Sequence, residues 1–175
     1  GSPHRGAQLA TLSAIHHEKL SDPHIMDCIR KIQEAGPSDI QAAAIRNVGR
    51  QHERAVRVPT DLVRAHAKAR SEGFDAWSRA REHRRFSDFV PALRELVSLT
   101  RRIAHCHGEA EHIYDNLLEE FDPGSRTAEL RPLFVRLRKE LSRFVANCQS
   151  SEGPEPLNLQ ISKTAQMRLN ERVVH

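Results

Sequence analysis

Residues 114–124 of the chain read Tyr-Asp-Asn-Leu-Leu-Glu-Glu-Phe-Asp-Pro-Gly. Ile113, Leu117 and Phe121 recur every four residues, so they would share one face of a helix. Asp122-Pro123-Gly124 is typical of a turn, so the stretch predicts a short helix that ends sharply. Apolar stripes at helical spacing, stopped by proline or glycine, recur along the whole chain. No segment shows the sustained period of two that indicates a strand.

The first helix boundaries can be placed from the same kinds of residue. After an initial apolar helical stripe, Asp22-Pro23 supplies an N-cap and a proline that together open a second helix, which stops at Gly36-Pro37. Ser38 and Gln41 have the spacing of a capping box and open a third helix. That helix must end before Pro59, because the residue before a proline disfavours helical geometry.

A long fourth helix follows, capped by Thr60 or Asp61. Within it, Gly73 is a candidate kink, and Trp77 is expected to anchor the core. The last three helices are expected to open at Ser87, within the stretch quoted above, and near Thr127, with the helix from Ser87 closing near Gly108.

These segments predict an all-α fold class: an antiparallel bundle of about seven helices plus a short C-terminal helix. Residues 3–149 would form the helical region. Residues 150–156 are polar, contain two prolines and predict a linker. Residues 157–175 predict a weakly helical tail.

Composition narrows the classes of protein to consider. Hydrophobic residues make up 38% and charged residues 29% of the 175, as in ordinary globular proteins. No apolar run approaches the roughly 20 residues of a membrane-spanning helix. Cys28, Cys106 and Cys148 are widely spaced and form no Cys-x-x-Cys pair, so we expect reduced thiols and a cytoplasmic location without membrane attachment.

The formal net charge of +4 has two interpretations. A basic surface could bind nucleic acid or an acidic partner. Alternatively, the arginines are interleaved with acids and simply solvate the helices. Aromatic residues, on which bases would stack, make up only 5% of the chain, which argues against nucleic-acid binding.

The densest group of metal-ligand residues lies at 105–112. On an unbroken helix His105, Glu109 and His112 would share a face and could hold zinc or iron. Gly108 falls between them, where a helix break would scatter the three side chains. They are the only metal candidates, and they are weak ones; we expect no metal, catalytic or cofactor-binding residue in this chain. His52 is expected on an exposed polar face.

The stretch from Tyr114 to Gly124 also resembles a known pattern, Tyr-Asp-x-Leu-Leu-x-x-(Tyr/Phe)-(Glu/Asp)-Pro-Gly, of the N-terminal part of the carboxypeptidase Taq family of zinc metallocarboxypeptidases. The likeness spans residues 5–148. It departs at Arg84-Arg85, where that family often has an acidic or amide residue before Phe86. Five further stretches agree in order and spacing: Gln8–Pro23, Arg57–Val63, Trp77–Arg81, Phe86–Leu93 and Thr127–Arg138.

The resemblance implies an all-helical region that borders the peptide groove of a homodimeric zinc enzyme. The family's zinc-binding His-Glu-x-x-His helix is not in these 175 residues. His-Glu occurs only at His17 and His52, and the fifth positions are Ser21 and Val56. We therefore expect the chain alone to be inactive, with zinc and a peptide substrate only in a full-length enzyme. The alternative is a freestanding, non-catalytic interaction or dimerisation module derived from that family.

Overall fold

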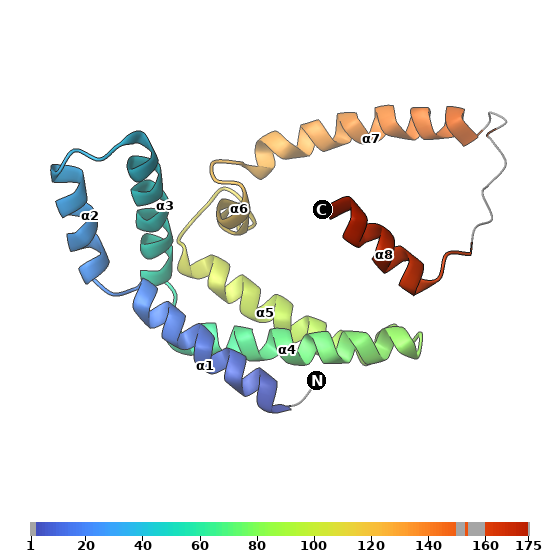
Figure 1. The fold of residues 1–175 in the computed structure, drawn as a ribbon, viewed down its shortest axis with the longest axis horizontal. Helices are drawn as coiled ribbons and strands as arrows, with labels where there is room; N and C mark the ends of the chain where they lie inside the picture. Colours follow the sequence, from blue (N-terminus) through green and yellow to red (C-terminus); the bar gives the residue numbers. More distant parts are fainter. Residues whose placement is uncertain (1–2, 150–152, 154–159, 175) are drawn as a thin grey trace. The chain divides into compact units, whose positions relative to one another are not determined.

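The computed structural model describes residues 3–149, 153 and 160–174. Within this part of the chain all regular structure is helical, which confirms the all-α fold class (Figure 1). One short 3-10 helix, η1 (Phe86–Asp88), precedes α5. The α-helices are α1 (Pro3–Leu20), α2 (His24–Glu34), α3 (Asp39–Val56), α4 (Thr60–Glu82), α5 (Val90–Cys106), α6 (Asp115–Phe121), α7 (Thr127–Gln149) and α8 (Lys163–Val174).

The chain divides into two compact units, Gly1–Thr127 and Ala128–His175. In the first unit α4 packs against both α1 and α5, and Figure 1 shows each neighbour running antiparallel to it. Val58 and three helical residues, Leu62, Ala69 and Leu99, form the buried centre. Leu62 and Ala69 are seven residues apart on α4, so they line one face toward α5.

Gly73 lies inside α4, which runs unbroken from Thr60 to Glu82. A Cβ added at Gly73 would lie 2.7 Å from Leu96 Cδ1, closer than carbon atoms pack. The glycine therefore allows α5 to approach α4 closely. This close contact, and not the predicted kink, accounts for a glycine at position 73.

The helix starts agree with the sequence at α3 and differ at α4 and α5, and α5 begins at Val90 instead of at Ser87, which lies in η1. Gln41 N–H donates to Ser38 Oγ at 3.4 Å, and Ser38 N–H donates to Gln41 Oε1 at 2.9 Å, which confirms the capping box of α3. At α4, however, Pro59 holds the N-cap position and no side chain caps the helix. The predicted cap at Thr60 or Asp61 is therefore wrong, because both residues are already helical.

The second unit contains α8 and all but the first residue of α7. The helix of the predicted tail is present as Lys163–Val174. Most of the predicted linker, 150–156, lies outside the described residues, so that division stays a prediction. No residue of α7 is buried, and its large apolar side chains are exposed.

Candidate functional site

Residues 114–124 form α6 and the turns around it, where the ends of α3 and α5 meet it. Asn116 Nδ2 donates hydrogen bonds to the carbonyl oxygens of Ala104, at 3.0 Å, and Gly108, at 2.8 Å. Ala104 O also accepts the His107 N–H at 3.2 Å, so Asn116 adds a second donor there and supplies a donor to Gly108 O beyond the end of α5. Arg54 Nη2, from α3, donates to the Asn116 carbonyl oxygen at 2.9 Å.

Asp115 begins α6 and is only 5% exposed. Its Oδ1 accepts a 2.8 Å hydrogen bond from the backbone N–H of Thr127, the first residue of α7. This N–H bond holds the pKa of Asp115 below its usual value, since it stabilises the carboxylate form. The aspartate therefore links the start of α6 to the first residue of α7.

Glu119 organises the turn that follows α6. Its Oε2 accepts from the Gly124 N–H at 3.2 Å and from Arg126 Nη1 at 3.0 Å, and these donors lower its pKa. Gly124 has φ +89°, a left-handed conformation that favours glycine. Phe121, by contrast, is 83% exposed. The polar residues of the stretch thus serve structure, and the sequence signalled the turn but not these partners.

His107 lies beside this junction, just after α5. Its Nδ1 is buried, and among the described atoms it has no hydrogen-bond partner. Burial, followed by the charges of Arg54 and Arg57, lowers the pKa of His107 to about 4. Arg57 Nη1 also donates to the His107 carbonyl oxygen at 3.2 Å. His107 is therefore neutral near pH 7.

The candidate metal ligands do not share a helical face. His105 is in the last turn of α5, which ends at Cys106, and Gly108 has φ +96°. Glu109 and His112 follow in the loop, where His112 Nδ1 accepts the Tyr114 N–H at 3.1 Å. Across residues 3–149, 153 and 160–174, no three His, Cys, Asp or Glu side chains are grouped to hold a metal ion.

The exposure of two other residues differs from the prediction made from the sequence. His52 is buried, and its Nδ1 is 2.8 Å from the Leu20 carbonyl oxygen at the end of α1, so the expected exposed position is wrong. Trp77 is 39% exposed and lies beside Phe74 and under Arg81, whose guanidinium is 5.3 Å from the ring centroid. It is a surface residue of α4 and not a core anchor.

The sequence profile of the Carboxypeptidase Taq (M32) metallopeptidase family matches residues 1–175. The chain belongs to this family. It is 31% identical to thermostable carboxypeptidase 1 of Thermus thermophilus over 157 residues, which cover 81% of this chain and 30% of that protein. With the Pyrococcus furiosus protein of the same name it shares 28% identity, over 78% of this chain and 28% of the relative.

Solved structures show the same fold. The chain superposes on the BsuCP crystal structure with a TM-score of 0.88 at 23% identity, covering 99% of this chain and 36% of that one. The Pyrococcus furiosus carboxypeptidase structure gives a TM-score of 0.75 at 26% identity, with 94% and 34% covered. This carboxypeptidase Taq family chain therefore spans about a third of the length of its relatives.

The family name implies a bound metal ion, so we asked whether side chains of this chain could bind it. Each His-Glu pair of the chain lacks a second histidine at the required spacing, and His52, in one pair, already contacts the end of α1. The described residues therefore do not fit the family's metal. None of the described helices is long and apolar enough to cross a membrane.

Proposed function

We propose that this chain serves as the helical, groove-bordering N-terminal part of a carboxypeptidase Taq-like metallocarboxypeptidase and is inactive alone. The observation that carries the proposal is the family match over residues 1–175, together with an alignment of 157 residues that covers only 30% of the Thermus thermophilus relative. In the complete enzyme, zinc would polarise the water that releases a C-terminal residue from a peptide. The helices of this chain would form the scaffold beside the site of that reaction.

The exposed apolar surface of α7 is evidence that another polypeptide packs against this helix. Its main apolar residues recur at alternating spacings of four and three, which is the pattern of a helix that packs along its whole length. All but Leu130 are exposed, and large exposed apolar stripes mark interaction sites. The stripe consists of Leu130, Phe134, Leu137, Leu141, Phe144 and Cys148.

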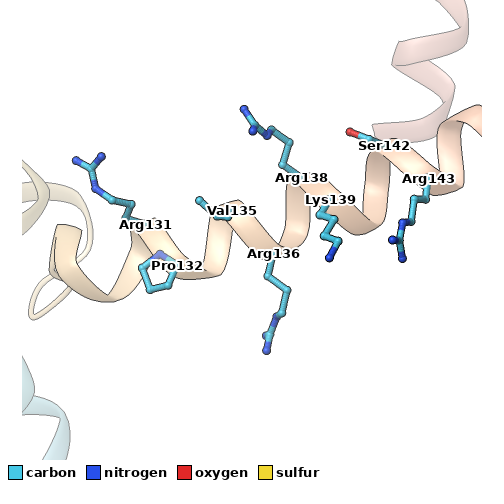
Figure 2. A pocket seen from close by; sticks show the side chains of 8 residues that line it. All are labelled: Arg131, Pro132, Val135, Arg136, Arg138, Lys139, Ser142 and Arg143. Atoms are coloured by element: carbon cyan, nitrogen blue, oxygen red, sulfur yellow. The ribbon is translucent and has the colours of Figure 1, made fainter.

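Cations surround this stripe. Figure 2 shows Arg131 and Arg138 projecting from one side of α7, and Arg136, Lys139 and Arg143 from the other. Interspersed acids on α7 are limited to Glu129 and Glu140. We propose that the remaining two thirds of a family enzyme covers the stripe and supplies acidic groups at its edges.

The first test is chemical. Purified chain should show no turnover of a blocked peptide with a free C-terminus and no stoichiometric zinc by elemental analysis. Turnover, or one zinc per chain, would overturn the proposal that the reactive part lies elsewhere.

The second test is complementation with the segment of the Thermus thermophilus relative that lies beyond the matched part. Co-expression should yield a stable complex, and Leu137→Asp should abolish it because a charge would enter the stripe. Val135→Asp is the matched control, because residue 135 lies on the opposite side of α7 and is equally a surface position. Equal loss with both variants would contradict docking through the stripe.

A second candidate function, the freestanding dimerisation module, is favoured by the same heptad-like spacing. Charge argues against it, because an antiparallel pair would bring Arg131 and Arg138 of one copy against the same residues of the other. Light scattering separates the two: a dimer that Leu137→Asp dissociates supports the module, and a monomer supports the proposed enzyme part.

A further inference from the structure

A shallow groove runs along the face of α5 that α4 does not cover. It begins at Phe86 of η1, whose ring is 67% exposed and meets Phe89 edge-on with 6.2 Å between ring centroids. Its floor is apolar and one wall is basic. The side chains that define it are Val90, Leu93 and Val97, with Arg94, Arg101 and Arg102.

The groove has the repeat of a helix-packing surface. Val90 and Val97 are seven residues apart, and so are Arg94 and Arg101. With a rise of 1.5 Å per residue, each pair is separated by about 10 Å along α5. The apolar row and the cationic row therefore run side by side for about two turns.

The cationic wall is not neutralised by nearby acids. Neither Asp88 nor Glu95 lines the groove, and Asp88 already pairs with Arg85 at 2.9 Å. Among the ion pairs of the described residues, none involves Arg94, Arg101 or Arg102. Three guanidinium groups therefore face solvent beside an apolar floor.

We propose that this groove docks an amphipathic helix of a partner protein that carries leucine-type side chains on one face and carboxylates along its edge. A helix is favoured over an extended peptide, because the described part of the chain has no strand edge to extend. The heptad-spaced rows match the repeat of such a helix. Guanidinium groups bind carboxylates in bidentate geometry, which fixes the register.

The chemistry of the groove also favours an acidic amphipathic helix over a nucleic acid or a second copy of this chain. A nucleic acid would use the cations but not the aliphatic floor, and the edge-on rings of Phe86 and Phe89 form no flat stacking platform. A second copy could offer α7, but that helix carries five basic and two acidic residues and would repel the wall. The site lies on α5 and does not depend on the proposed role of α7.

The probe is a fluorescein-labelled peptide of about 21 residues, three heptads long, with leucine at the core positions and glutamate at the flanking ones. Anisotropy titration with the full chain should give saturable binding that weakens with added salt, because exposed ion pairs are screened. The same peptide with lysine in place of glutamate should bind at least about tenfold more weakly.

Charge reversal locates the site. Arg94→Glu combined with Arg101→Glu should weaken binding of the glutamate peptide by at least about tenfold. Lys31→Glu combined with Arg46→Glu is the matched control: it makes the same change in net charge at exposed positions of α2 and α3, away from both proposed docking surfaces. That control should retain binding to within about twofold.

Three results would overturn the proposal: no saturable binding of the glutamate peptide, equal loss with the α5 variant and the Lys31/Arg46 control, or tighter binding of a labelled single-stranded DNA than of the peptide. Circular dichroism of both variants keeps the comparison valid, and Arg94→Gln with Arg101→Gln provides a milder pair if the glutamates unfold α5. The α7 complementation above is a separate readout, so either idea can fail alone.

Discussion

The side-chain amide of Asn116 donates a 2.8 Å hydrogen bond to the carbonyl oxygen of Gly108, where the chain leaves α5 with a positive φ of +96°. The same Nδ2 reaches Ala104 O. Asn116→Ala removes this donor from both oxygens, although Ala104 O keeps the His107 N–H, so the free energy of unfolding should fall by about 1–2 kcal/mol. Urea denaturation followed by circular dichroism measures this.

Two variants check the cause of that loss. Asn116→Asp keeps the shape but replaces the donor with a carboxylate, so it should destabilise at least as much as alanine at pH 7. Asn47→Ala removes an exposed asparagine whose side chain accepts hydrogen bonds from Arg50 and Gln51, and it should change stability by less than about 0.5 kcal/mol. Equal effects at 47 and 116 would refute the capping role.

His107 should make stability depend on pH in the acid range. Its pKa is lowered to about 4 in the folded chain, so between about pH 6.5 and 4 the unfolded state binds more protons than the folded state. The contribution of neutral His107 to the free energy of unfolding is therefore complete above the unfolded pKa of about 6.5. It is lost as the pH falls from there toward the folded pKa of about 4. Because the side chain is only half-buried, we expect a loss on the order of 1–2 kcal/mol.

The measurement is urea unfolding at a series of pH values for the wild type and His107→Gln. The variant should show a flatter dependence between about pH 6.5 and 4. An NMR titration of the His107 ring provides a direct check, and a midpoint near 6.5 in the folded chain would contradict the assigned environment.

Arg84 adopts φ +53°, although it is neither glycine nor asparagine. The left-handed region costs an L-residue roughly 1–2 kcal/mol, so Arg84→Gly should stabilise the chain by about 0.5–1 kcal/mol after the glycine's entropy is counted. His83→Gly is the neighbouring control: with φ −84° it gains nothing and should destabilise slightly. A rise in Tm with both variants, or with neither, would rule out backbone strain as the cause.

The helices were predictable because local chemistry sets where they begin and end. Ser38 and Gln41 are three residues apart and make the two bonds of a capping box wherever α3 lies in the fold. Gly108 likewise ends the segment after α5 by its own conformation. The departure at Arg84 was visible in the sequence, but its strained conformation was not.

Long-range partners could not be predicted from periodicity. His52 is seven residues after Ile45 and three before Ala55, so helical spacing places it on the buried face of α3. Spacing does not reveal its partner, Leu20 O, 32 residues earlier, which it contacts because α3 packs beside the end of α1. Asn116 and Arg54 are 62 residues apart in the sequence, and only the tertiary fold brings them into hydrogen-bonding distance. The polar residues of the junction therefore have roles that depend on which helix ends the fold brings together.

Gly73 and Leu96 provide the sharpest test of helix packing. Gly73→Ala improves helix propensity by about 1 kcal/mol, but its Cβ would lie 2.7 Å from Leu96 Cδ1. Since overpacking costs typically about 1–3 kcal/mol, we expect a net destabilisation of about 1 kcal/mol. In a Leu96→Ala background the clash is gone, and the same substitution should stabilise by about 1 kcal/mol.

The double-mutant cycle should therefore give a coupling of about 2 kcal/mol between residues 73 and 96. Gly49→Ala is the matched control inside α3: its added Cβ would meet Ile29 Cδ1 at 3.7 Å, an ordinary contact, so the propensity gain of about 1 kcal/mol should appear in full. A coupling near zero would mean that α4 and α5 separate freely at this point. The close approach would then not be what Gly73 provides.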